Sequence, residues 1–523
     1  MDRPNVLFLM SDEHNPRFLS HREGGEPVQT PTLSDIAERG TDFESAYCPY
    51  PICGPSRKCM MTGQEVQECD AWSNESSVYL PGTTTLPGTL RDDGYETCLV
   101  GKMHFQGTNQ FNGFQHRPYG DLTGHGVQQP GHQPDPIDPD ELDVQPRRQG
   151  IEKGTRIPGA GVTQVPESML QENVVARETI SWLREHRHQR GDRPWFLTAS
   201  FSRPHFPLTA PRRHFERYWP DNVPEPPVGY EGDTVDHPYT QERREDLHLE
   251  SFTETELERA RAAYFACVDF LDEVLGELLG TLDDEGFLEN TIVVYTTDHG
   301  DMAGEHGLWW KQTWHEGSAG IPWSVQLPGH RSGDLDPASV STPVNLIDLF
   351  PTLCGLTDVA VPDEVSGHDL SETVRTGAEP DRGPVFTDQL PTYRMVREGR
   401  YKYVAFRDAP ELLFDLEADP HEQTNLAPDA TGADAAALER LSGVVEETID
   451  FDAVEQQRRE AEAEMEAYKL PIAPGTGNSY LMPDGRLVDA TTPLYKPDVL
   501  ADRPDLVFTD WPDRDEHADD GGV

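Results

Sequence analysis

Short apolar runs alternate with helix-length segments along much of the chain, and this alternation limits the fold more than any other feature. The runs occupy residues 6–10, 97–100, 195–201, 291–297 and 323–327. The segments between them include amphipathic stretches at residues 167–188 and 254–282. Helix-length connections between buried strands are typical of parallel strands with crossover helices. The pattern therefore predicts an α/β fold with a large mixed, mostly parallel sheet flanked by helices.

The pattern changes near residue 383, and we predict a domain boundary there. Runs typical of short antiparallel strands occupy residues 385–388, 393–397, 401–406 and 412–415, and a strongly charged helix is expected at 435–470. The predicted units are a large α/β domain at 1–382, a small C-terminal domain of antiparallel sheet plus helix at 383–470, and an extended arm at 471–523. Two Pro-rich stretches, 115–165 and 221–250, are expected as insertions because such long loops are usually functional or disordered.

The chain carries 94 Asp and Glu residues against 43 Lys and Arg, for a net charge of −51. A surface this acidic repels nucleic acid and anionic membranes, so neither is expected as a partner. Salt relieves the self-repulsion of such a surface. Lysine is confined to residues 58, 102, 153, 311, 402, 469 and 496. Together these features indicate a halophilic source.

Signals for membrane insertion and secretion are missing from the sequence pattern. No apolar run approaches the roughly 18 residues that a membrane span needs. The first run begins almost at the initial Met and leaves no room for a signal peptide. The 7 cysteines are odd in number and scattered, unlike a disulfide framework. We therefore expect a cytoplasmic protein, and a homo-oligomer is compatible with the sequence.

Polar residues directly follow four of the apolar runs, at residues 11–14, 101–104, 202–205 and 298–301. Open α/β sheets bind ligands beyond the carboxyl ends of their strands, so we expect these segments to meet in one crevice. Asp12 and Asp298 would supply carboxylates and His299 an imidazole, a donor set that suits Ca²⁺, Mg²⁺ or Mn²⁺. Taken alone, Asp12 is equally typical of a helix cap and His299 of a loop histidine.

A cysteine lies within a string of unusual specificity, which runs from Cys53 through Gly54-Pro55-Ser56-Arg57 to Thr62-Gly63. A Cys before Gly-Pro lies on a tight turn, and Ser56 is a candidate helix N-cap. Cys53 would then lie near a helix N-terminus that favours an anion. Taken alone, such a Cys is more often a small buried hydrophobe. The whole string, however, resembles the sulfatase signature C-x-P-S-R-x-x-x-x-T-G at every fixed position.

Further segments are similar to the same family, the formylglycine-dependent sulfatases of the alkaline-phosphatase superfamily. They are residues 5–12, Gly101-Lys102-Met103-His104, Pro204-His205-Phe206-Pro207, Asp298-His299-Gly300-Asp301, Gly304-Glu305-His306-Gly307 with Lys311, and the stretches 393–403 and 414–426. The closest resemblance is to the branch of choline sulfatases and phosphonate monoester hydrolases, and it rests on the sequence of residues 101–105 and on the Asp298-His299 pair. The resemblance thus covers most of the chain.

The resemblance implies hydrolysis of a sulfate monoester to an alcohol and inorganic sulfate. In this family the cysteine, here Cys53, is oxidised to formylglycine by a formylglycine-generating enzyme, and the aldehyde hydrates to a diol. One hydroxyl attacks sulfur in line, and the second loses its proton as sulfate leaves and the aldehyde re-forms. The substrate would be a small-molecule or sugar sulfate ester, with choline, aryl and sugar esters all open.

The resemblance also implies roles for individual side chains. The metal ligands would be Asp12, Glu13, Cys53 as formylglycine, Asp298 and His299, with Ca²⁺ favoured over Mg²⁺ or Mn²⁺. Arg57 and Lys102 would hold the hydrated aldehyde, and His104 would be the base that expels sulfate. His205 and Lys311 would grip sulfate and protonate the leaving oxygen. Asn74 matches a sulfate-contacting Asn of the choline-sulfatase branch, although an Asn that caps a turn is nearly as expected.

Two alternatives to sulfate-ester hydrolysis remain open. A phosphonate-monoester or phosphodiester hydrolase would use the same site, and an inactive sulfatase-like protein would bind anions or glycans.

Glu13 departs from the Asp, Asn or Gln usual in the family, and its extra methylene moves the carboxylate. A choline-type substrate would need aromatic or acidic groups around its ammonium, for which Trp309, Trp310 and Trp314 are candidates, although packing roles are equally expected.

Overall fold

A computed structural model of the protein describes residues 3–466 except 23, 107–108, 121–155, 164, 230–234 and 249–250. Beyond residue 466 it describes only the backbone of β18 (Ser479–Leu481), β19 (Leu487–Asp489) and β20 (Leu494–Tyr495). Most of the predicted insertion at 115–165 and of the predicted arm at 471–523 therefore lies outside the described residues. The boundaries of the predicted domains stay predictions.

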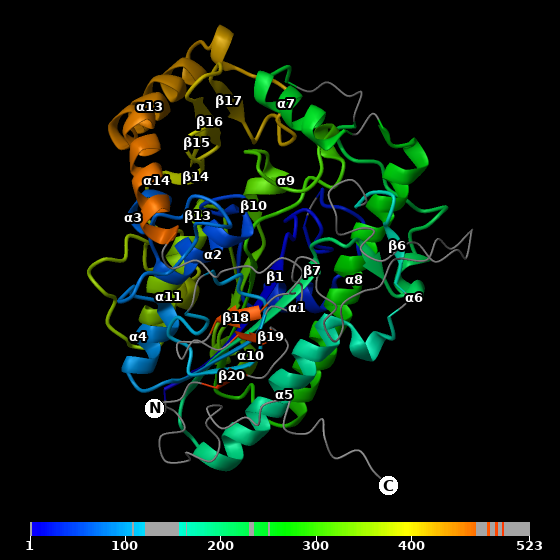
Figure 1. Ribbon diagram of the computed structural model, residues 1–523, viewed down its shortest axis with the longest axis vertical. Helices are drawn as coiled ribbons and strands as arrows, with labels where there is room; N and C mark the ends of the chain where they lie inside the picture. Colours follow the sequence, from blue (N-terminus) through cyan, green and yellow to red (C-terminus); the bar gives the residue numbers. More distant parts are fainter. Residues whose placement is uncertain are drawn as a thin grey trace.

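A nine-stranded sheet of order β12-β2-β11-β9-β1-β7-β4-β5-β20 lies at the centre (Figure 1). All its strands except β11 and β20 run in the same direction. The prediction of a large mixed, mostly parallel sheet is therefore confirmed. The strands are β1 (Asn5–Asp12), β2 (Thr41–Phe43), β4 (Glu96–Gly101), β5 (His116–Tyr119), β7 (Trp195–Pro204), β9 (Thr291–Thr297), β11 (Trp323–Gln326), β12 (Ala338–Val340) and β20.

β1 is the central strand, and its side chains alternate between two cores. Val6, Phe8 and Met10 pack with α2 (Cys53–Thr62), α4 (Leu86–Asp92) and α11 (Leu349–Leu356). Leu7 and Leu9 pack on the other face with α1 (Pro31–Glu38), α5 (Gln171–Arg190) and α8 (Glu254–Asp284). Figure 1 shows this layering, with the sheet between the two sets of helices. Strands covered on both faces have to be apolar throughout, which explains why the runs were recognisable.

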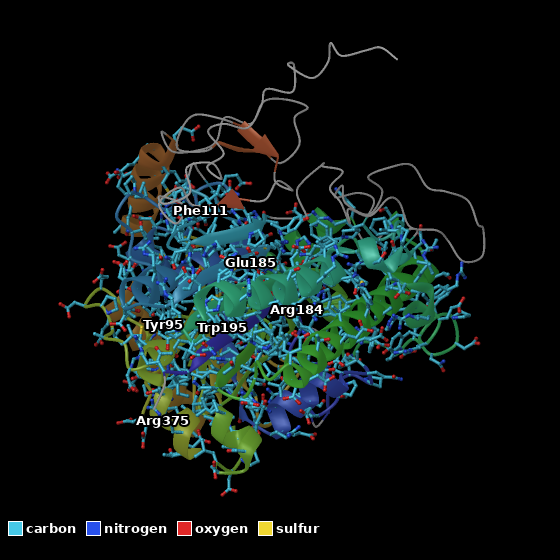
Figure 2. All side chains as sticks on the ribbon, turned by 90° about the horizontal axis from the view of Figure 1, so that it is seen from below. Tyr95, Phe111, Arg184, Glu185, Trp195 and Arg375 are labelled. Atoms are coloured by element: carbon cyan, nitrogen blue, oxygen red, sulfur yellow. The ribbon has the colours of Figure 1, made fainter. Side chains whose placement is uncertain are left out.

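The helix α5 illustrates why the amphipathic segments became flanking helices. Trp182 and Leu183 are buried against the sheet, whereas Arg184 and Glu185 are exposed. In the view of Figure 2 charged side chains such as Arg375 lie at the edge of the molecule, while Tyr95 and Trp195 are buried. None of the helices in the described part of the chain has an apolar stretch long enough to cross a membrane.

A small antiparallel sheet follows, as predicted, with β14 (Val385–Gln389), β15 (Tyr393–Glu398), β16 (Tyr401–Phe406) and β17 (Leu412–Asp415) in sequence order. The expectation of one helix at 435–470 is wrong in its extent, because two helices, α13 (Ala433–Thr448) and α14 (Phe451–Met465), occupy this region. Ile449 is extended, and the Asp450 side chain accepts hydrogen bonds from the backbone of Asp452 and Ala453. An Asp that caps a new helix in this way ends the preceding one.

Candidate active site

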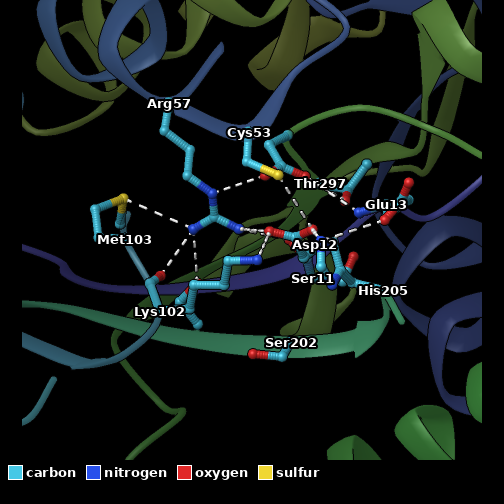
Figure 3. Close-up of polar contacts among 12 residues, drawn as sticks. Ser11, Asp12, Glu13, Cys53, Arg57, Lys102, Met103, Ser202, His205 and Thr297 are labelled. Carbon is cyan, nitrogen blue, oxygen red and sulfur yellow. Dashed lines mark hydrogen bonds and ion pairs between the residues drawn. The ribbon is translucent and has the colours of Figure 1, made fainter. Parts of the chain in front are cut away.

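The four polar segments that follow β1, β4, β7 and β9 meet at the carboxyl ends of these strands, as predicted. Because β7 and β9 flank β1, Asp12 lies beside the ends of both neighbours. The N-terminus of α2 points into the same crevice and delivers Cys53 and Arg57 (Figure 3). The parallel topology therefore converts distant sequence positions into one buried cluster.

Cys53 is the first residue of α2, and the cap residue is Ile52. Its Sγ lies 3.1 Å from Lys311 Nζ, 3.2 Å from His299 Nε2 and 3.7 Å from Asp12 Oδ1. Burial raises the pKa of the thiol, but Lys311, Lys102, His299 and a hydrogen bond from His104 outweigh it and hold the pKa well below its ordinary value. The site therefore stabilises negative charge on this side chain.

Ser56 does not cap α2, so that expectation is wrong. The helix begins four residues earlier than expected, with Ile52 as its N-cap, and Ser56 lies inside its first turn with its Oγ donating to the backbone oxygen of Asp298 at 2.6 Å. Asn74 takes part of the capping role, because its Oδ1 accepts a hydrogen bond from the Gly54 N–H at 2.8 Å. This contact places the start of α2 next to the loop that carries Asn74, while a contact to sulfate stays a prediction.

Arg57 bridges the two carboxylates that follow β1 and β9. Its Nη2 lies 2.8 Å from Asp12 Oδ2 and its Nε lies 2.7 Å from Asp298 Oδ2, and Lys102 Nζ also lies 2.8 Å from Asp12 Oδ2. Burial and Cys53 oppose ionisation of Asp12, yet Lys102, His205 and Arg57 outweigh them and lower its pKa well below the usual range. Arg57 and Lys102 thus keep a carboxylate ionised inside the protein.

The cluster fits a divalent cation. One ligand atom from each of Asp12, Cys53, Asp298 and His299 can be chosen so that all lie within 4.8 Å of one another, and Asp12, Glu13 and His205 form a second, overlapping group. His299 Nδ1 lies 2.9 Å from the Gly300 oxygen and donates to it, so Nε2 is the atom presented to the cluster. Burial opposes protonation of His299, but Asp298 outweighs it and raises the pKa to about 9, so the position attracts positive charge.

Glu13 gives an independent reason to place a cation here. Its Oε1 is buried and has no hydrogen-bond partner among the described residues, while Oε2 accepts from Lys311 at 3.2 Å. Burial raises the pKa of Glu13 to about 8, because Lys311 offsets only part of the desolvation. Glu13 also has a φ of +67°, which is uncommon for a non-glycine residue. A buried carboxylate whose desolvation is only partly offset by a neighbouring cation, and which lies on strained backbone, is typical of a functional site.

His205 closes the other side of the crevice. Its Nε2 lies 3.5 Å from Glu13 Oε2 and 3.8 Å from Asp12 Oδ1, and its Nδ1 donates to the Phe206 oxygen at 2.7 Å. Burial, Lys102 and Lys311 lower the pKa of His205 to about 3, so the imidazole is neutral before an anion binds. An incoming anion would offset the two lysines and favour protonation of Nε2.

Two residues of the site have no sequence signal that could have identified them. Tyr264 of α8 donates from its hydroxyl to the Glu13 oxygen at 2.7 Å and accepts from the Asn15 N–H at 2.9 Å, which supports the strained loop. Arg156 places its guanidinium carbon 3.4 Å from the Phe206 ring centroid, beside His205. In the sequence, one is an aromatic on an amphipathic helix and the other an arginine near the end of a predicted insertion.

Comparisons with known proteins agree with the geometry. The family model described as Sulfatase matches residues 4–359, and that described as N-sulphoglucosamine sulphohydrolase, C-terminal, matches residues 304–444. A choline-sulfatase of Rhizobium meliloti is 32% identical over 482 residues, which cover 88% of this chain and 90% of that protein. An arylsulfatase of Clostridium perfringens is 28% identical over 81% of this chain and 90% of its own length.

Solved structures share the fold. The phosphonate monoester hydrolase of Agrobacterium radiobacter matches with a TM-score of 0.69 and 24% identity, covering 94% of this chain and 100% of its own. A protein in complex with its substrate D-glucosamine-2-N,6-O-disulfate matches with a TM-score of 0.67 and 22% identity, covering 88% and 98%. At these identities the likeness extends to the fold and leaves the substrate of this chain undetermined.

Proposed function

The chain belongs to the sulfatase family, and on that premise we propose that it hydrolyses a sulfate monoester to an alcohol and inorganic sulfate. The nucleophile is formylglycine made from Cys53, and one divalent cation, foremost Ca²⁺, with Mg²⁺ or Mn²⁺ as alternatives, completes the site. The observation that supports this most is the place of Cys53 Sγ, between Lys311 Nζ at 3.1 Å and the Asp12, Asp298 and His299 cluster. In the matured enzyme an oxygen of the hydrated aldehyde takes the place of this sulfur.

The cation would be held by Asp12, Asp298, His299 and the group derived from Cys53, with Glu13 Oε1 as a further ligand. When bound, it acts as a Lewis acid that lowers the pKa of the diol and neutralises sulfate oxygens. Arg57 and Lys102 keep the Asp12 carboxylate ionised so that it can bind the cation, and Arg57 also pairs with Asp298.

The remaining side chains hold and move protons. Lys311 Nζ donates to the position of the nucleophile and to Glu13 Oε2, which places an ammonium beside the sulfate oxygens. His104 contacts the Cys53 side chain and serves as the base for the hydroxyl proton during sulfate release. His205, made more basic by the bound anion, donates to the leaving oxygen. Asn74, whose side chain accepts from Gly54 at the start of α2, contacts a sulfate oxygen.

Maturation requires a formylglycine-generating enzyme as a partner. We place the enzyme in the cytoplasm of a halophilic host, since a net charge of −51 is best tolerated in high salt.

Three of the described lysines, Lys58, Lys102 and Lys402, are buried, and Lys311 is only 13% exposed. The four described lysines are therefore all largely withdrawn from water, and both catalytic lysines are intact, which argues against an inactive anion- or glycan-binding protein.

A phosphonate-monoester or phosphodiester hydrolase is the second candidate, because the Agrobacterium radiobacter enzyme shares the fold over 94% of this chain. A sulfate monoester presents three terminal oxygens, whereas a diester replaces one with an alkoxy group that needs an apolar slot. The crevice offers cations at Lys102 and Lys311 and a neutral imidazole at His205 that a bound anion makes more basic, and we therefore favour the sulfate monoester.

We expect kcat/KM for nitrophenyl sulfate to exceed that for matched phosphate-diester and phosphonate esters by at least about tenfold in high salt, or roughly 1.4 kcal/mol in the barrier. Choline-O-sulfate is included as a further substrate. A preference of the same size for the diester or the phosphonate would replace the proposed function by the second candidate.

A further inference from the structure

Arg156 is a cation at the edge of the site that none of the proposed catalytic roles uses. Its guanidinium carbon lies 3.4 Å from the centroid of the Phe206 ring and 5.0 Å from that of the Trp310 ring. Phe206 directly follows His205, and Trp310 directly precedes Lys311. The two rings that hold Arg156 are therefore attached to the two residues proposed to grip sulfate and protonate the leaving oxygen.

The same ring links Arg156 to the nucleophile. Lys311 Nζ lies 5.9 Å from the Phe206 centroid and 3.1 Å from Cys53 Sγ, so Arg156 and the ammonium at the reaction centre both lie near the same aromatic ring. The His205 and Phe206 rings are 3.9 Å apart between centroids, so Arg156 and the proposed proton donor to the leaving group pack on the same ring. Because His205 is the proposed proton donor to the leaving oxygen, a group near it is also near the alcohol half of the ester.

Arg156 is charged and partly withdrawn from water. It is half-buried, and burial lowers its pKa to about 10, while Glu13, Asp301 and Cys53 act in the opposite direction. Guanidinium binds carboxylates and sulfates through two parallel hydrogen bonds, and loss of water strengthens such pairs. Trp310, the second ring beside Arg156, has a buried indole N–H with no acceptor in the described part of the chain. Its φ is +63°, which is uncommon for a non-glycine residue.

The arrangement also opposes a cationic substrate. A trimethylammonium group binds to exposed aromatic faces, and the Phe206 and Trp310 rings already carry a guanidinium. A second cation there would be repelled by Arg156 at short range. Trp310, one of the three aromatic candidates for a choline site, thus already has a cation beside its ring.

Resting on the proposed function, we propose that Arg156 binds a second anionic group, a carboxylate or a sulfur oxyanion, on the alcohol half of the sulfate ester. The preferred substrates are then sulfate esters of acidic or multiply sulfated alcohols. Esters of quaternary ammonium alcohols are poor substrates, despite the resemblance of the chain to a choline-sulfatase.

The test compares phenyl sulfates that carry a carboxymethyl, sulfonatomethyl, carbamoylmethyl or trimethylammoniomethyl group in the meta position, where a methylene insulates the leaving oxygen. At constant ionic strength we expect kcat/KM for one of the two anionic esters to exceed that of the neutral carbamoylmethyl ester by at least about tenfold, as a charge-assisted pair allows. The trimethylammonio ester should fall below the neutral one. In Arg156→Gln the ratio of anionic to neutral ester should drop to about three or less.

Arg259→Gln is the matched control, because Arg259 Nη2 donates to the Pro158 oxygen at 2.8 Å and so supports the same segment as Arg156. It should keep the wild-type ratio. A wild-type preference for the trimethylammonio ester, or an undiminished anionic preference in Arg156→Gln, would overturn the inference.

Failure of the proposed function gives a different result. If sulfate esters are not cleaved but phosphonate esters are, the same substituents on phenyl phosphonates report the ratio. Binding of the phenyl sulfates to the full-length Cys53→Ala protein, measured by calorimetry, gives the charge preference even without turnover. If the neutral ester binds to this variant as tightly as both anionic esters, the proposed role of Arg156 is contradicted, whether or not the enzyme cleaves sulfate esters.

Discussion

Replacement of Cys53 by alanine is expected to lower kcat/KM for a sulfate ester by more than about 10⁴-fold, the scale seen when a nucleophile is removed. The side chain lies between Lys311, His299 and Asp12, and no other nucleophilic group of the described residues takes that position. Cys53→Ser should give at most one turnover, because a single hydroxyl can attack sulfur but leaves no second hydroxyl to expel sulfate. Release of nitrophenol, followed as a burst and a steady state, distinguishes the two variants.

The control for this variant is Cys354→Ala. Cys354 is a fully buried thiol of α11 and packs in the core on the α2 side of the sheet, away from the polar cluster. Its loss should reduce stability through a small cavity while kcat/KM stays within about threefold of the wild type. Retention of more than about one hundredth of the activity in Cys53→Ala would contradict the assignment of the nucleophile.

Removal of the charge of Asp298 is expected to abolish cation binding and to raise the barrier by several kcal/mol, as loss of a Lewis acid does. In Asp298→Asn the crevice loses one of its carboxylate ligands, and Arg57 Nε loses its charged acceptor at 2.7 Å. The protein should contain far less than stoichiometric metal by elemental analysis, and calorimetry with Ca²⁺ should show no binding. Both readouts are independent of activity.

A matched variant separates metal loss from general destabilisation. Asp388 and Arg394 form a buried pair of the same type in the small sheet, with oxygen–nitrogen distances of 2.9 and 2.7 Å. Asp388→Asn should lower the unfolding temperature, because it leaves a buried guanidinium with only the more distant carboxylate of Glu65, at 3.6 Å, as a charged partner. It should nevertheless keep its metal. If Asp298→Asn retained full metal content and activity, the cation site would have to be elsewhere.

Much of the fold could be predicted from the sequence because buried parallel strands are apolar on both faces. Residues 6–10 and 291–297 became β1 and β9, and the rule that ligands bind beyond strand carboxyl ends placed Asp12 and Asp298 together. The direction of β11 could not be predicted from its composition. It runs antiparallel to β9 because the chain between them contains only short helical turns and no crossover helix on the far face.

The predictions that were wrong or absent have local structural causes. Ser56 matched an N-cap in residue type, but Asn74, distant in the sequence, satisfies the Gly54 N–H and lets α2 start at Cys53. The end of α13 depends on the Asp450 side chain, which periodicity does not detect within a charged helix. Arg156 acquires its position only through stacking on Phe206 and Trp310, and such tertiary contacts leave no pattern in a single sequence.

The most direct test of the central claim is the chemical state of residue 53 in active enzyme purified from the native host. Peptide mass spectrometry, with and without an aldehyde-trapping hydrazine, should show the peptide that contains Cys53 as an aldehyde, in a fraction that rises in proportion to specific activity. Protein made without a maturing enzyme should carry the free thiol and be inactive. Fully active enzyme whose residue 53 is entirely an unmodified thiol would contradict the account.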